Sequence, residues 1–259
     1  MKDKLSIIKI GGNVVNSPTE LDRFLQDFAS LEGFKILVHG GGKIASEVSA
    51  SMGLEPKMSG GRRITDEQTL DVVTMVYAGL LNKKIVSKLQ GLDSNAIGLS
   101  GADGNSIRAH KRVVKDLDYG FAGDVDEVGS AMIESLLRSG LCPVFCAITH
   151  DQKGQLLNTN ADTIASELAK GLSRKFDVEL LYCFEKDGVL EDVENEDSVV
   201  ERIDARKYEQ MKELGQIAEG MLPKMKNCFE ALERGVSRVI IGSPDLLMDP
   251  KRKHTTLTL

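Results

Sequence analysis

The apolar residues of this chain follow two alternating periods. Short apolar runs typical of buried strands occur at 5–10, 35–39, 95–99, 142–148, 178–183 and 238–242. Between them, apolar residues three and four apart predict helices from Ser17 to about Leu31 and at 43–52, 66–89, 129–139, 161–171, 204–213 and 223–234. Strands that alternate with helices predict an α/β fold with a mainly parallel sheet covered on both faces.

Two short stretches predict helix starts. In Ser17-Pro18-Thr19-Glu20, serine suits the N-cap, proline the first helical position and glutamate the third. Thr65-Asp66-Glu67-Gln68 is a second capping box at the start of the long helix. Residues 106–127 lack helical period and predict short hairpin strands instead.

Composition narrows the class of protein. The formal charge of −6 over 259 residues argues against binding to nucleic acid or to acidic membranes. No run reaches the length of a membrane span, and the first ten residues lack a signal-peptide core. The four cysteines form no C-x-x-C pair, so we expect reduced thiols in a cytoplasmic protein. The scattered histidines make a transition metal held by the protein unexpected.

Two glycine turns follow the first two predicted strands. Gly11-Gly12 ends the first strand, and Gly40-Gly41-Gly42 leads from the second strand into a helix. Glycine backbone N–H groups can approach an anion closely, and a helix N-terminus adds its dipole. Each turn is also compatible with a plain strand-to-helix connection. Neither turn matches a Walker A loop or a dinucleotide-binding fingerprint.

Lys9 lies inside the apolar run that ends at Gly11. A buried ammonium group is costly without a partner. Lys9 therefore either faces an anion at the mouth of the sheet or extends to solvent from an edge strand. Its position beside the glycine turn favours the anion.

Polar residues also precede the predicted helix at 161–171. Asn158, Asn160 and Asp162 alternate, which places them on one face at the end of a strand. Asn160 or Asp162 could simply cap the helix. The same face could instead bind a polar ligand, with Asp162 orienting two lysines.

Two further stretches carry cations. Arg62 and Arg63 follow two glycines, and either is a surface residue or a clamp for a carboxylate. Lys224 falls in the first turn of a predicted helix, where a cation opposes the helix dipole. That small penalty suggests a phosphate partner, although a plain surface helix remains an alternative.

Seven motifs in order resemble one family. The order K-x-G-G, V-H-G-G-G, G-x-R-x-T, G-L-S-G-x-D-G, G-F-x-G-[DE]-V, N-x-N-A-D and G-M-x-x-K resembles the N-acetyl-L-glutamate kinases of the amino acid kinase superfamily, from Lys9 to about Gly242. The resemblance implies an open three-layer αβα sandwich with two lobes. An N-terminal lobe, 1–172, would bind the acylglutamate and form the dimer, and a C-terminal lobe, 173–259, would bind ATP.

The resemblance also implies residue roles. Lys9 and Lys224 would stabilise the transferred phosphoryl group, and Asp162 would organise them. The backbones of Gly11 and Gly12 would hold phosphates. The acylglutamate would contact Gly41, Gly42, Arg63, Asn158 and Asn160. The nucleotide would lie near Glu185, Lys186, Asp187, Gly188, Val189, Leu190, Gln216, Ile217 and Ala218.

The chemistry agrees with these roles. A γ-carboxylate has a pKa of about 4.3, so it is already ionised at neutral pH and needs no general base. Lysines, backbone dipoles and a Mg²⁺ ion held mainly by ATP oxygens would bring the two anions together.

The chain departs from the family at Gly60-Gly61-Arg62-Arg63, where Asn-Gly-Leu-Arg is usual. The extra guanidinium of Arg62 could pair with a second carboxylate on a longer acyl group such as succinyl. The stretch 184–189 and the C-terminal tail also differ from the family pattern.

Other functions stay open. A glutamate 5-kinase or an aspartokinase would share the fold, and so would a non-catalytic sensor of nucleotide or amino acid. Because few residues precede Lys9, the resemblance implies a homodimer that L-arginine does not inhibit.

Overall fold

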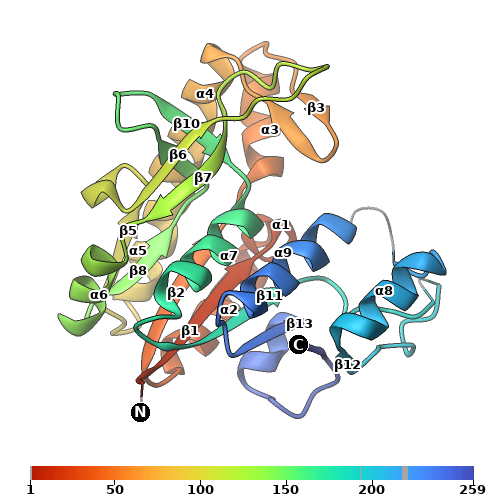
Figure 1. The fold of residues 1–259 in the computed structure, drawn as a ribbon. Helices are drawn as coiled ribbons and strands as arrows, with labels where there is room; N and C mark the ends of the chain where they lie inside the picture. Colours follow the sequence, from red (N-terminus) through yellow and green to blue (C-terminus); the bar gives the residue numbers. More distant parts are fainter. Residues whose placement is uncertain (1, 193, 218–220) are drawn as a thin grey trace.

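A computed structural model describes residues 2–192, 194–217 and 221–259. Within these residues, the largest sheet has eight strands in the order β12-β14-β13-β11-β1-β2-β8-β5 (Figure 1). Their bounds are β1 Lys4–Ile10, β2 Phe34–His39, β5 Ala96–Leu99, β8 Cys142–Phe145, β11 Asp177–Cys183, β12 Arg202–Ile203, β13 Arg238–Gly242 and β14 Thr255–Leu257. The strands from β5 to β13 pair in parallel, and β14 runs antiparallel to β13. The predicted mainly parallel sheet is confirmed.

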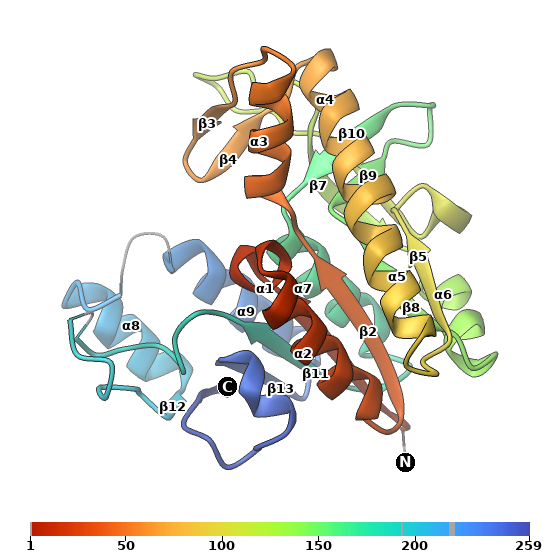
Figure 2. The ribbon, with the colours of Figure 1, turned by 180° about the vertical axis from the view of Figure 1, so that it is seen from behind.

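Helices cover both faces of this sheet, which makes three layers. Helices α6 (Ser130–Arg138), α7 (Ala161–Leu172) and α9 (Leu222–Glu233) lie on the face seen in Figure 1. Helices α1 (Gly12–Asn16), α2 (Pro18–Ser30) and α5 (Asn82–Gln90) lie on the opposite face, shown in Figure 2. Helix α8 (Ala205–Glu213) lies at the end of the sheet that carries β12. None of the helices in the described ranges is long and apolar enough to span a bilayer.

The long predicted helix begins one residue later than its capping box suggested. Asp66, and not Thr65, is the N-cap, and its carboxylate accepts a hydrogen bond from the Thr69 N–H at 2.8 Å. The helix then runs through α4 (Glu67–Thr74), a π-helical stretch η1 (Met75–Leu81) and α5. At the first predicted helix, Ser17 caps α2 as expected.

A smaller group of strands stands above the carboxyl end of the main sheet. Strands β6 (Ile107–Lys111), β7 (Ala122–Val128), β9 (Ile148–His150) and β10 (Leu156–Thr159) close on one another. The hairpin predicted within 106–127 is therefore confirmed. The predicted strand 142–148 was too long, because the chain leaves β8 after Phe145 and joins the second group as β9.

A hairpin of β3 (Lys57–Ser59) and β4 (Arg62–Ile64) lies beside α3 (Gly42–Ser51) (Figure 2). This hairpin, β12 and β14 were not predicted, because their short strands lack a clear apolar alternation. Of β10, only the strand end at Asn158 was expected.

The main sheet crosses the predicted boundary between lobes without a break. Strand β1 pairs with β2 on one side and with β11 on the other, so residues 4–10 and 177–183 are direct neighbours. Helix α7 ends at Leu172, where the boundary was predicted, and packs against both β1 and β11. The parallel strands β1 and β2, from residues 1–172, and β11, from residues 173–259, therefore end at the same edge of the sheet. The separate roles of the two lobes remain a prediction.

Candidate active site

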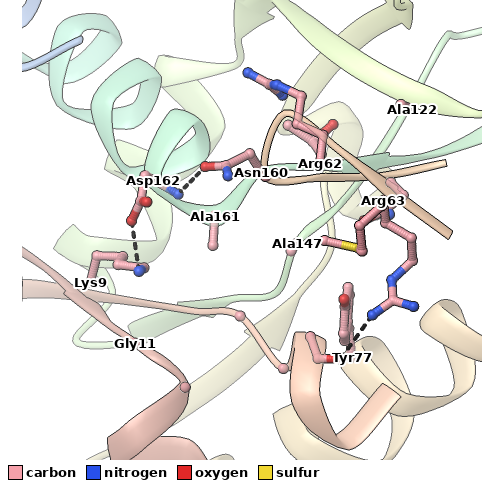
Figure 3. Close-up of a pocket in the computed structure, with 18 of the residues that line it drawn as sticks. Lys9, Gly11, Arg62, Arg63, Tyr77, Ala122, Ala147, Asn160, Ala161 and Asp162 are labelled. Carbon is pink, nitrogen blue, oxygen red and sulfur yellow. Dashed lines mark hydrogen bonds and ion pairs between the residues drawn. The ribbon is translucent and has the colours of Figure 1, made fainter. Parts of the chain in front are cut away.

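Both glycine turns line one cleft at the carboxyl edge of the sheet. Gly11 and Gly12 follow β1, and Gly41 and Gly42 open α3 after β2. With Lys9, Arg62, Arg63 and the segment 158–162 they enclose about 220 Å³ (Figure 3). This volume is below the ~300–1,000 Å³ of pockets for drug-sized ligands, so it suits a small polar molecule.

Lys9 has a carboxylate partner at the base of this cleft. Its Nζ lies 2.6 Å from Oδ1 of Asp162, and only 7% of the residue is exposed. Because β1 is hydrogen-bonded on both sides, the alternative of an edge-strand lysine is wrong. The Asp162 carboxylate thus compensates the charge of the buried ammonium group.

Lys224 reaches the same carboxylate from the other end of the chain. Its Nζ lies 3.9 Å from Oδ2 of Asp162 and 4.3 Å from the centre of the Phe184 ring. The Nζ of Lys9 lies 5.5 Å from that ring centre. Burial lowers the pKa of Lys224, the Asp162 carboxylate opposes this shift, and Lys9 adds to it. The structure thus brings all three predicted catalytic residues together.

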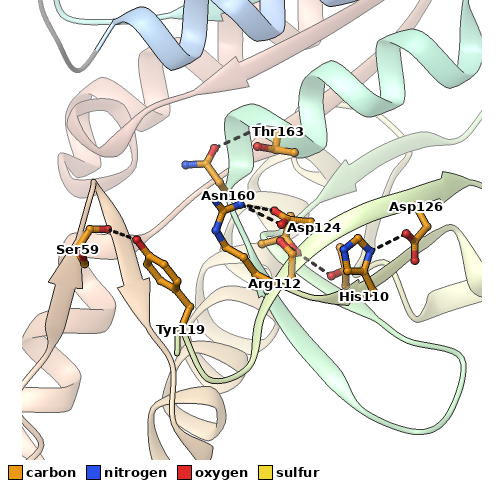
Figure 4. Close-up of polar contacts among 11 residues, drawn as sticks. Ser59, His110, Arg112, Tyr119, Asp124, Asp126, Asn160 and Thr163 are labelled. Atoms are coloured by element: carbon orange, nitrogen blue, oxygen red, sulfur yellow. Dashed lines mark hydrogen bonds and ion pairs between the residues drawn. The ribbon is translucent and has the colours of Figure 1, made fainter. Parts of the chain in front are cut away.

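Asp162 is fixed in place by its own helix. It lies in the first turn of α7, where a carboxylate interacts favourably with the helix dipole. Asn160 is the N-cap, and its side-chain oxygen accepts hydrogen bonds from the N–H groups of Asp162 (2.8 Å, Figure 3) and Thr163 (3.1 Å, Figure 4). The Tyr182 hydroxyl donates to the Asp162 carbonyl at 2.9 Å. The capping interpretation therefore holds for Asn160, which also lines the cleft.

Arg63 is buried on the opposite wall, with 6% of its surface exposed. Its Nη2 donates to the Gly42 carbonyl and to the Ser46 hydroxyl, both at 2.8 Å. Its Nη1 is buried and has no hydrogen-bond partner among the described residues. A buried donor without a partner is costly, so this nitrogen is suited to a carboxylate that enters the cleft.

The remaining predicted substrate residues are close by. Asn158 lines the cleft and donates to the Thr65 hydroxyl at 3.0 Å, which leaves its carbonyl oxygen available. At Gly41 an added Cβ would lie 2.3 Å from Cδ1 of Leu81 and 3.0 Å from Cδ1 of Tyr77. Glycine is thus required there by close packing against η1.

Among the described residues, those predicted near the nucleotide do not line this cleft, and Glu185, Lys186 and Asp187 line a second hollow of about 410 Å³ instead. Lys186 is paired with Glu196, and Asp187 with Arg252 at 2.9 Å. Val189 and Leu190 are buried, and the Val189 N–H donates to the Thr255 hydroxyl at 2.8 Å. Glu185 is exposed, Gly188 and Gln216 are half-buried, and Ile217 is buried. Ala218 lies outside the described residues.

Several cleft residues were not predicted. Tyr77, Ala122, Ala147 and Met58 line the cleft, and Phe184 contacts both lysines. Tyr77 and Ala122 sit in a helix and a strand that looked purely structural. Phe184 is the one residue of this set that the sequence could have indicated, because it directly follows the predicted strand 178–183, which was expected to end at the same edge of the sheet.

The fold and this cleft define a class of protein: α/β proteins that hold an anionic group between lysines and glycine turns at the edge of a parallel sheet. Residues 4–243 match the amino acid kinase family, and the chain belongs to it. The acetylglutamate kinase of Phocaeicola vulgatus is 54% identical over 241 residues, which cover 93% of this chain and 94% of that protein. The acetylglutamate kinase of Cytophaga hutchinsonii is 52% identical, with 98% and 97% covered. That of Methanopyrus kandleri is 37% identical, with 95% and 97% covered.

Solved structures confirm the fold. N-acetylglutamate synthase from Neisseria gonorrhoeae, complexed with coenzyme A and N-acetyl-glutamate, has a TM-score of 0.83 at 22% identity over 99% of this chain and 59% of that chain. Carbamate kinase from Giardia lamblia, bound to AMP-PNP, has a TM-score of 0.69 at 15% identity over 99% of this chain and 98% of that chain. At these identities the likeness concerns the fold alone.

Proposed function

We propose that this protein transfers the γ-phosphoryl group of ATP to the side-chain carboxylate of an N-acyl-L-glutamate. The names of its relatives point to N-acetyl-L-glutamate as the substrate. The reaction would be a step of arginine biosynthesis. The observation that carries the proposal is the contact of Lys9 and Lys224 with one carboxylate, Asp162, in a cleft whose other wall holds Arg63. Close relatives named acetylglutamate kinase support the choice of substrate.

The reaction needs positioning more than proton transfer. A carboxylate oxygen of the substrate attacks the γ-phosphorus, the bond to the β–γ bridging oxygen breaks, and ADP leaves with that electron pair. No proton moves, because the nucleophile is already ionised. Lys9 and Lys224 stabilise the charge on the transferring group, while Asp162 keeps the two ammonium groups from repelling each other.

Binding of the two substrates uses opposite parts of the cleft. We assign one substrate carboxylate to the unpartnered Nη1 of Arg63, and polar groups of the acylglutamate to Asn158, Asn160 and the backbone of Gly41 and Gly42. We assign the ATP phosphates to the backbone N–H groups of Gly11 and Gly12. The nucleotide would extend towards 185–190 and 216–217, where Lys186 and Asp187 are already paired with other side chains.

We propose that Mg²⁺ enters with the nucleotide and is held mainly by phosphate oxygens. The described residues contain no group of three or more histidine, cysteine or acidic side chains arranged to hold a metal. Both oxygens of Asp162 already face lysines. When bound, Mg²⁺ would neutralise phosphate charge.

We also propose that a second copy of the chain is a partner. Met75 and Leu80 on η1 are large apolar residues with 52% and 42% of their surface exposed, although they adjoin a buried helix face. A dimer could cover these two residues, and sedimentation of wild type compared with Leu80→Lys would test this.

All four cysteines are buried free thiols, in keeping with a cytoplasmic protein.

The activity is tested by trapping the acyl phosphate with hydroxylamine. Purified protein, ATP and Mg²⁺ are incubated with N-acetyl-L-glutamate, L-glutamate or L-aspartate. We expect hydroxamate only with the N-acylated substrate. Product with a free amino acid would indicate another kinase of the family, and binding without turnover would indicate a sensor.

A further inference from the structure

Arg62 is a second guanidinium at the cleft that the proposed chemistry does not use. Arg62 and Arg63 are consecutive residues of β4, so their side chains point to opposite sides of the strand. In Figure 3, Arg63 extends towards Tyr77, whereas Arg62 extends along the side of the cleft that carries Asn160. The two arginines therefore serve different parts of the cleft.

Arg62 is half-buried but has no ion-pair partner. No carboxylate in the described ranges pairs with it, and Asp124, the one carboxylate among them whose charge acts on its pKa, is already engaged by Arg112. Nη1 of Arg112 donates to both oxygens of Asp124, at 2.8 and 2.9 Å (Figure 4). Burial lowers the pKa of Arg62, the nearby charge of Arg112 lowers it further, and Asp124 and Tyr119 oppose this shift. A positive charge in excess therefore remains beside the mouth of the cleft.

A half-buried cation without a partner favours an anionic occupant. Two carboxylates of an acylglutamate already have cations assigned to them, one at the lysine pair and one at Arg63. A third carboxylate of the same substrate would lie on its acyl group. Ala122 and Ala147 line the cleft with only methyl side chains, so these two positions add little bulk to its wall.

We propose that the site favours an N-acyl-L-glutamate whose acyl group itself ends in a carboxylate, as in N-succinyl-L-glutamate, and that Arg62 binds that carboxylate. This inference rests on the proposed kinase function and names the substrate class of the same site. The phosphoryl transfer is unchanged, since only the far end of the substrate differs.

The test compares three substrates that separate charge from length. N-acetyl-, N-butyryl- and N-succinyl-L-glutamate are assayed with ATP and Mg²⁺, using wild type, Arg62→Ala and Lys57→Ala. Lys57 is an exposed cation on the same hairpin that does not line the cleft, so it is a matched control. For wild type we expect kcat/KM on N-succinyl-L-glutamate to exceed that on the other two by about tenfold or more, as for a charge-assisted hydrogen bond.

The variants decide the role of Arg62. Arg62→Ala should lower kcat/KM on the succinyl substrate by about 10–100-fold and leave the acetyl value within about threefold. Lys57→Ala should leave the ratio of the two unchanged. Equal kcat/KM on acetyl and succinyl substrates, or a loss in Arg62→Ala that appears in the KM for ATP, would overturn the inference while leaving the kinase function intact. Absence of product with every acylglutamate would overturn the proposed function itself.

Discussion

The cleft and the region assigned to the nucleotide hold their charged groups in different ways. On the acylglutamate side, Arg63 keeps a buried Nη1 without a partner and Arg62 has no ion pair among the described residues. On the side assigned to the nucleotide, Lys186 is paired with Glu196 and Asp187 with Arg252. Free cations on one side suit a small, highly charged substrate.

The difference has a chemical reason. Carboxylates are recognised by the fork of an arginine, which must be left unpaired until the ligand arrives. A nucleotide base offers a flat, weakly charged surface, so backbone groups and apolar contacts are sufficient on that side. Substitutions on the two sides should therefore differ strongly in their effects.

The largest effect is expected at the base of the cleft. Lys9→Ala removes the buried ammonium beside the transferring group and should lower kcat by about 10²–10³-fold. The matched control is Lys226→Ala, because the Lys226 side chain is 74% exposed on the same helix as Lys224. Steady-state kinetics of both variants, with a thermal melt to verify folding, check this. A similar kcat for the two variants would contradict the assignment.

The next effect is expected at Arg63. Arg63→Ala removes the buried donor and should raise KM for the acylglutamate by about 10–100-fold, since hydrogen bonds to charged groups contribute about 1.5–3 kcal/mol. The KM for ATP should stay within about twofold. Measuring both KM values in the same variant tests whether the two sides act separately. A matching rise in the KM for ATP would show that they do not.

A smaller effect is expected in the pH profile. Because burial lowers the pKa of Lys224, this lysine loses its proton at a lower pH than an ordinary lysine. The cation is needed, so kcat/KM should fall on the alkaline side, by about tenfold per pH unit above that pKa. In Lys224→Arg the fall should move to higher pH. An identical alkaline limb in both proteins would rule out Lys224 as its cause.

The smallest effect is expected on the nucleotide side. Glu185→Ala removes an exposed side chain and should change KM for ATP by no more than about fivefold, the size of an exposed polar contact. The KM for the acylglutamate should not change. A larger rise in the KM for ATP would mean that charged side chains also recognise the nucleotide, which would remove the contrast between the two sides.

The local features of this protein could be predicted from its sequence. The cap at Ser17, the buried strands around Lys9 and the glycine turns depend on residues within a few positions of each other, and each was placed correctly. The short strands β3, β12 and β14 were not predicted, because two or three residues are too few to show an apolar alternation. For β12 the pairing partner, β14, is also distant in sequence.

The individual roles at the cleft came from the family resemblance more than from local pattern. For Lys9, Arg62 and Lys224, the sequence alone could not exclude a purely structural or surface role. Residue order was enough to indicate a parallel sheet with glycine turns at one edge, because both follow from local periodicity and backbone geometry. Which charges meet at that edge is a property of the folded chain, since β1 pairs with β11 and α9 carries Lys224 back to Asp162. Burial then sets the pKa values and interaction energies of these charges, because a buried lysine beside a carboxylate behaves differently from the same lysine in water.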